Sequence, residues 1–98
     1  MKLMTKELEK KFEKFPICSQ DGLMDEAEVV VKYFFPFGRA TWLITEGDKG
    51  EDGDWEFFGY CTLGQEWEWG YVTLRELEEI GFVERDLYCK GKKVKDLI

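Results

Sequence analysis

The chain has 98 residues, of which 44% are apolar and 16% aromatic, so it predicts one folded domain (1–98) and excludes a disordered chain. Its net charge of −7 disfavours direct binding to nucleic acid or to an anionic membrane surface, because both are negatively charged. No apolar run is long enough to span a bilayer, and the three cysteines are isolated, so we expect a cytoplasmic protein with reduced thiols.

A helix is predicted near the N-terminus, at residues 5–15. Its apolar side chains recur at helical spacing, Thr5 is suited to be the N-cap, and Pro16 ends the element. A connecting segment rich in turn residues follows at 19–28.

Four strands are predicted in the middle of the chain, because β-branched and aromatic residues there recur with a period of two. Short connections that contain glycine separate these runs, which favours antiparallel pairing of neighbours along the chain. The predicted strands are residues 28–38, 40–46, 54–63 and 66–72.

A second helix is predicted directly after the last of these strands. Thr73 and Glu76 form a capping-box pattern that opens a helix at 74–80, and Gly81 is suited to end it. The predicted class is therefore α+β: a four-stranded antiparallel β-meander with an N-terminal helix and a short helix after the last meander strand.

The C-terminal residues give weaker signals. We expect short strands at 82–83 and 87–89, and a solvated basic patch formed by the lysines of 90–95.

The whole net charge falls in one quarter of the chain, residues 46–68, which holds eight acids and one base. The pairs Asp54/Glu56 and Glu66/Glu68 are each two residues apart, so neighbouring strands would bring four carboxylates onto one surface. Trp67 is the first candidate for an exposed aromatic anchor, and Trp55 is the second. We interpret the stretch as a partner-binding surface; a plain solvated sheet surface is the alternative. The candidate residues are Glu46, Asp48, Glu51, Asp52, Asp54, Trp55, Glu56, Glu66, Trp67 and Glu68.

The sequence offers little for catalysis or metal binding. Histidine is absent, which excludes histidine-dependent triads and zinc sites that contain histidine. Counted as a calcium loop from Asp48, the chain has Gly50 at the third position and Gly59 at the twelfth, where ligands are needed. We therefore predict no enzyme activity, no cofactor and no metal. The alternative is a small metal-dependent enzyme or accessory protein that uses the carboxylates from Asp48 to Glu56.

Five segments, in order, carry a resemblance to a known family: VVVKYFFPFG (29–38), TWLITEGD (41–48), DWEFFGYCTLG (54–64), EWGYVTLREL (68–77) and ERDLY (84–88). In these segments the chain resembles small bacterial proteins grouped as domain of unknown function twenty-nine fifty-eight. The resemblance implies a cytoplasmic protein of a bacterial host, encoded on a plasmid, phage or integrative element. It brings no catalytic residues.

By analogy with other small proteins of mobile elements, the resemblance implies a non-enzymatic inhibitor of a host nucleic-acid-guided defence nuclease, of the anti-CRISPR type. The expected partner is a host CRISPR effector nuclease, whose positively charged channel would attract an acidic surface. Neither nucleic acid nor membrane is expected to bind directly. The chain is expected to be a monomer or a homodimer. A further alternative is a self-associating accessory protein, in which the acidic stretch meets the lysines of another copy.

Overall fold

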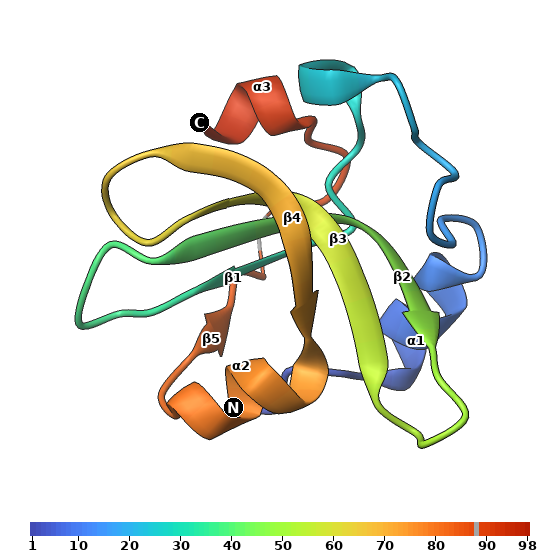
Figure 1. Cartoon of the computed structure of the whole chain (residues 1–98), viewed down its shortest axis with the longest axis horizontal. Coiled ribbons are helices and arrows are strands. Elements are labelled where there is room, and N and C mark those ends of the chain that lie inside the picture. Colours follow the sequence, from blue (N-terminus) through green and yellow to red (C-terminus); the bar gives the residue numbers. More distant parts are fainter. Residues whose placement is uncertain (88) are drawn as a thin grey trace.

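The computed structural model describes residues 1–87 and 89–98. A curved five-stranded antiparallel sheet lies at the centre of this part of the chain, and short helices lie on both of its sides (Figure 1). The elements in chain order are α1 (Lys6–Phe12), the 3-10 helix η1 (Met24–Glu26), β1 (Val31–Phe34), β2 (Thr41–Lys49), β3 (Trp55–Thr62), β4 (Trp67–Thr73), α2 (Leu74–Ile80), β5 (Glu84–Arg85) and α3 (Val94–Leu97).

The predicted α+β class and the β1–β4 meander are confirmed, but the sheet has one strand more than predicted. Its order is β4-β3-β2-β1-β5, and β5 pairs with β1 through Tyr33↔Arg85 and Phe34↔Glu84. The short strands predicted at 82–83 and 87–89 are wrong. Phe82 has a φ of 60°, which is incompatible with an extended strand, and residues 87 and 89 lie outside any strand. Residue 88 of that prediction lies outside the described residues.

The first two strands differ in length from the prediction. β1 covers only 31–34. Residues 28 and 29 pair instead with the C-terminal segment, where the Val29 N–H donates to the Lys92 carbonyl at 2.9 Å. β2 is longer than predicted, and its register shifts between Ile44 and Glu46, which marks a β-bulge. β1 pairs with β2 only as far as Val31↔Ile44, so among the described residues the last part of β2 has no neighbouring strand on that side.

Both predicted helices exist, and both predicted N-caps are confirmed. Thr5 accepts a hydrogen bond from the Leu8 N–H at 3.2 Å, although α1 ends at Phe12 rather than at residue 15. At the start of α2, Thr73 accepts from the Glu76 N–H at 3.1 Å, and the Glu76 carboxylate accepts from the Thr73 N–H at 2.9 Å. These reciprocal bonds satisfy two of the amide groups that a helix start leaves free.

The two faces of the sheet bury separate apolar clusters. Phe12 of α1 packs on Trp55 and Phe57, with ring centroids 5.4 Å away in each case, and Leu77 of α2 is buried in the same cluster. On the other face, Val94 of α3 is buried in a smaller cluster. Consequently α1 and α2 lie on one side of the sheet, and η1 and α3 on the other (Figure 1).

Part of the predicted C-terminal basic patch belongs to the helices that cover the η1 and α3 side of the sheet. Residues 94–97 form α3, which was not predicted, and Lys93 and Lys95 make ion pairs with Glu26 of η1 at 2.9 Å and 2.6 Å. These two lysines therefore have an acidic partner within the chain. No helix among the described residues is both long and apolar enough to cross a membrane.

Candidate functional site

Five aromatic side chains in contact with one another cover the β3–β4 hairpin on the side of η1 and α3. We call them the aromatic ladder, and this side of the sheet the aromatic face; the ladder consists of Phe58, Tyr60, Trp67, Trp69 and Tyr71. Side chains of directly paired residues in an antiparallel sheet point to the same face. The ring centroids of the pair Phe58 and Tyr71 are 4.9 Å apart, and those of the pair Tyr60 and Trp69 are 4.8 Å apart. Phe58 also stacks on Trp69 at 5.6 Å, with 15° between the ring planes, so the rings form one continuous surface.

The helices cover only one end of this ladder. Tyr60, Trp67 and Trp69 pack against the small cluster that contains Val94 and Leu97 of the C-terminal segment. Tyr71, at the other end, is 61% exposed. The open end of the ladder therefore lies toward the β2–β3 turn.

Exposed carboxylates continue the aromatic face at this open end. Asp48 on β2 pairs with Glu56 on β3, and Glu56 pairs with Thr73 on β4, which places the three side chains in one cross-strand row. Asp48 and Glu56 are both exposed, as are Glu51 and Asp52 in the turn between their strands. We call the whole patch the acidic–aromatic surface; it consists of Asp48, Glu51, Asp52, Glu56, Phe58, Trp69 and Tyr71.

Glu46, which the sequence predicts to be a partner-binding residue, lies on the aromatic face but is buried. Its side chain is only 3% exposed, and its two carboxylate oxygens accept hydrogen bonds from the Cys18 N–H at 2.7 Å and the Gln20 N–H at 2.9 Å. The segment that follows α1 contacts the part of β2 that extends beyond β1, and this carboxylate holds it there. The prediction that Glu46 is an open contact residue is therefore wrong for the free chain.

Two other candidate acids have structural partners of their own. Asp54 accepts hydrogen bonds from the Arg75 N–H at 3.0 Å and from the Trp55 N–H at 2.9 Å, so it helps to fix the start of α2 against the β2–β3 turn. Asp52 accepts from the Asp54 N–H at 3.0 Å within the turn. Because these bonds shape the backbone, Glu51 and Glu56 are the better positions at which to change charge.

The two tryptophans proposed as exposed anchors lie on opposite faces. Trp55 is 8% exposed and packs against Phe12 in the main core, so its proposed role as an exposed anchor is wrong. Trp67 is half-buried and stacks on Tyr60 at 5.3 Å, at the covered end of the ladder. Neither residue is the most accessible aromatic side chain near the acids.

The four carboxylates expected on one surface are separated. Although β3 and β4 are neighbours, Glu68 pairs with Cys61, and this pair points to the face opposite to Glu56. The antiparallel register also places Glu66 and Glu68 at the far end of the hairpin from Asp54 and Glu56. The predicted hairpin is confirmed, but its register keeps the two pairs apart, and the expected cluster is wrong.

The prediction missed the aromatic members of the acidic–aromatic surface, namely Phe58, Trp69 and Tyr71, of which Tyr71 is exposed and the other two are half-buried. A usable signal was present, because the alternation in each strand already places Phe58 on the same face as Glu56. Only the register between strands shows that Tyr71 completes the row that begins with Glu46 and Phe58.

The carboxylates do not gather into a larger cluster. Within residues 1–87 and 89–98, no group of three or more cysteine, aspartate or glutamate side chains is arranged to hold a metal ion. Asp48 and Glu56 face each other as a pair, and Asp48 also accepts a hydrogen bond from the Ile17 N–H at 3.2 Å.

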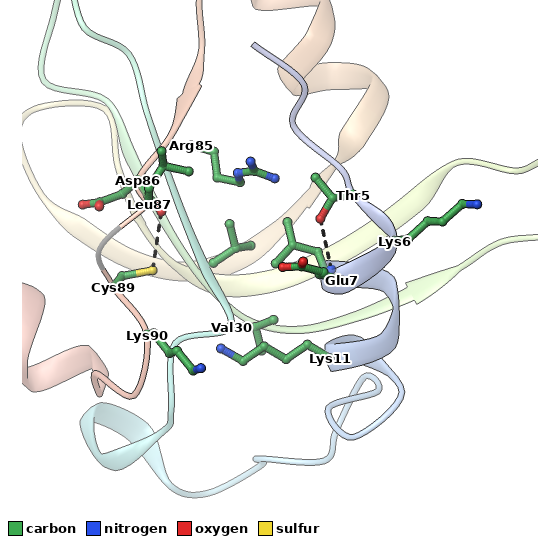
Figure 2. A pocket seen from close by; sticks show the side chains of 12 residues that line it. Thr5, Lys6, Glu7, Lys11, Val30, Arg85, Asp86, Leu87, Cys89 and Lys90 are labelled. Atoms are coloured by element: carbon green, nitrogen blue, oxygen red, sulfur yellow. Dashed lines mark hydrogen bonds between the residues drawn. The ribbon is translucent and has the colours of Figure 1, made fainter.

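A different hollow, of about 680 Å³, lies between α1 and residues 85–87 and 89–90 (Figure 2). Its described walls include four basic side chains, Lys6, Lys11, Arg85 and Lys90, and two acidic ones, Glu7 and Asp86. The side chains of Lys11 and Lys90 point toward each other, while Lys6 points away (Figure 2). This hollow is thus locally basic in a chain of net charge −7, and it contains none of the predicted site residues.

A family model described as "Protein of unknown function (DUF2958)" matches residues 3–94, which is nearly the whole chain. No curated protein and no solved structure matches the chain.

Proposed function

The chain belongs to the DUF2958 family, and from its acidic–aromatic surface we propose that it is a non-enzymatic inhibitor of a host nucleic-acid-guided nuclease, of the anti-CRISPR type. One observation carries the proposal: exposed carboxylates and accessible aromatic rings occupy adjacent rows of the same sheet face. Such a surface suits docking on a basic protein surface better than it suits catalysis.

The electrostatic part of the proposal concerns the channel that a guided nuclease uses for its nucleic acid. Such channels are positively charged because they hold a phosphate backbone. The carboxylates of Asp48, Glu51, Asp52 and Glu56 would be attracted to the same side chains and would occupy the place of phosphates. The inhibitor would therefore compete with guide or target strands for the channel.

The aromatic part of the surface would supply most of the affinity. Charge complementarity mainly raises the association rate, whereas buried aromatic side chains at the centre of an interface dominate the binding energy. Tyr71 is exposed and contacts Phe58, so this pair is available for burial against a partner. We propose Tyr71 and Phe58 in place of Trp55 and Trp67 as the aromatic contacts.

The surface is proposed to serve a partner other than a second copy of the chain. Self-association through the C-terminal lysines would require those lysines to meet the acids of another copy. Two of these four lysines, Lys93 and Lys95, instead pair with Glu26 of their own chain. We therefore expect a monomer, and light scattering at low salt checks this: a dimer that dissociates on adding salt would support the self-associating alternative.

The proposal is tested by capture of the partner. The tagged chain is incubated with lysate of a bacterial host that contains guided nucleases, and the proteins that it retains are identified by mass spectrometry. We expect a guided nuclease in the eluate, and we expect the purified chain to inhibit DNA or RNA cleavage by that nuclease. Recovery of only a metabolic enzyme, or a captured nuclease that cleaves at its full rate, would contradict the proposal.

A further inference from the structure

A small hollow of about 220 Å³ opens on the aromatic face between the 20–27 segment and the β3–β4 hairpin. Phe58 and Trp69 form its aromatic walls, and Met24 also lines it. Glu46 and Asp21 also line it, and no basic side chain does so among the described residues. The hollow therefore combines ring surfaces with two negative charges.

Glu46 is the unusual member of this lining. A carboxylate that is only 3% exposed carries a desolvation cost unless it is compensated by a positive charge or by hydrogen bonds. Within the described part of the chain Glu46 makes no ion pair, and its charge is met by the two amide groups of Cys18 and Gln20. A carboxylate offers about four lone-pair positions, so capacity for further donors remains.

The sheet register places this carboxylate beside the rings. Glu46 is the direct cross-strand partner of Phe58, Phe58 is the partner of Tyr71, and Phe58 stacks on Trp69. A cation held by Glu46 would thus lie against aromatic rings, and the face of an aromatic ring attracts cations, most strongly for tryptophan. Arginine suits both features, because its planar guanidinium stacks on rings and donates two parallel hydrogen bonds to a carboxylate.

We propose that this hollow receives the guanidinium of an arginine side chain that projects from the protein partner. That the guanidinium comes from a protein rests on the proposed function. That the occupant is a guanidinium rests only on the residues that line the hollow. Charge complementarity selects the occupant, since the described lining of the hollow contains two acids and no base. The proposal also assigns Glu46 a role that its burial in the free chain hides: it fixes the 16–20 segment and then accepts a partner's cation.

The hollow can be tested with the isolated chain and a small probe. The ¹⁵N-labelled protein is titrated with N-acetyl-arginine amide, and the resonances of the Trp69 indole N–H and the Gln20 amide are followed by NMR. We expect saturable shifts with a dissociation constant on the order of millimolar. N-acetyl-citrulline amide has a similar shape without the charge, and we expect it to bind about tenfold more weakly or not at all.

A pair of variants tests the site without changing the probe. Trp69→Leu removes one aromatic wall, whereas Trp67→Leu alters a half-buried tryptophan of the same strand that does not line the hollow. With folding checked by the amide spectrum, we expect Trp69→Leu to lose about tenfold in arginine affinity and Trp67→Leu to keep it. If either variant fails to fold, the comparison of arginine with citrulline on the natural chain still decides.

The outcomes separate this inference from the proposed function. Equal shifts with arginine and citrulline, or no saturable shift with arginine, would overturn the assignment of the hollow whatever the partner is. Arginine binding together with a capture experiment that yields no guided nuclease would overturn the proposed function alone. Arginine binding together with capture of the partner by the Trp69→Leu variant at undiminished yield would overturn the partner as the source of the guanidinium.

Discussion

Glu46 on β2 and Phe58 on β3 are direct cross-strand partners, so a buried carboxylate and an aromatic ring lie side by side on one face of the sheet. The next row toward the turn consists of Asp48 and Glu56, both exposed. The register of β2, β3 and β4 therefore brings the acidic and aromatic residues into one surface. Both the fold that produces this register and the function proposed for the surface can be tested.

The register depends on close contact between β2 and β3 at Gly59. A Cβ atom at this position would lie 2.1 Å from the carbonyl oxygen of Leu43, whereas one at its cross-strand partner Gly70 would meet no atom within 4 Å. We expect Gly59→Ala to lower the free energy of unfolding by at least about 3 kcal/mol, because the backbones must move apart. Gly70→Ala is the matched control, with an expected change within about 1 kcal/mol. Urea denaturation measures both, and equal losses would show that β2 and β3 do not approach each other closely at Gly59.

The ion pairs beside η1 predict a specific pH dependence. Hydrogen bonds from Lys95 and Lys93 lower the pKa of Glu26 from its ordinary value of 4.5 to about 2. Because the pKa is lower in the folded state, the stabilising contribution is complete above about pH 4.5 and is lost as the pH falls through about 2. An NMR titration of the Glu26 carboxyl carbon should give a midpoint near 2 in the natural chain and a higher one in Lys93→Gln/Lys95→Gln. A midpoint near 4.5 in the natural chain would contradict the ion pairs of Glu26 with Lys93 and Lys95.

The three cysteines are expected to differ in reactivity. Burial raises the pKa of Cys61 to about 12, so its reactive thiolate is scarcely populated near neutral pH. Cys18 is exposed, and Cys89 is buried. Alkylation with iodoacetamide at about pH 8, followed by peptide mass spectrometry, should modify Cys18 first and Cys61 only after unfolding. Modification of Cys61 in the folded protein at the rate seen for Cys18 would contradict the burial of its thiol.

The alternative of a metal-dependent function makes an opposite prediction in calorimetry. Calcium takes six to eight oxygen ligands, whereas Asp48 and Glu56 form a pair and no third carboxylate joins them among the described residues. Titration with calcium, magnesium and manganese should therefore give no heat of binding. Heat that the natural chain shows and that Glu56→Gln abolishes would support the metal-dependent alternative.

Local signals predicted much of the fold, and tertiary contacts decided the rest. The Thr73–Glu76 capping box lies within four residues, so the start of α2 was predictable from the sequence. The alternation of apolar residues likewise indicated β1 to β4. In contrast, β5 consists of only two residues and exists because they pair with β1, and the shift in the register of β2 follows from the bulge after Ile44.

The candidate site shows the same division. The acidic stretch was evident from composition, and Asp48, Glu51, Asp52 and Glu56 are exposed as expected. Glu46 lies in the same stretch, but the 16–20 segment covers it by a contact across 26 to 28 residues of sequence, which no local pattern indicates. Trp55 lies on the face opposite to the aromatic ladder and is buried there because α1 covers that face.

The most direct test of the proposed docking surface compares two pairs of charge reversals. Glu51→Lys/Glu56→Lys changes the acidic–aromatic surface, and Glu66→Lys/Glu68→Lys changes the far end of the hairpin, with Glu68 on the opposite face. Each pair moves the net charge from −7 to −3, since two replacements of −1 by +1 add 4. None of the four glutamates accepts a hydrogen bond within the described residues, so both variants should fold.

The measurement is inhibition of the captured nuclease by each variant, alongside its affinity for that nuclease. We predict that Glu51→Lys/Glu56→Lys loses at least about tenfold in affinity and no longer inhibits, while Glu66→Lys/Glu68→Lys behaves as the natural chain does. Full inhibition by Glu51→Lys/Glu56→Lys, or an equal loss in both variants, would contradict the proposed docking, because the acidic–aromatic surface would then not be the part of the molecule that meets the partner.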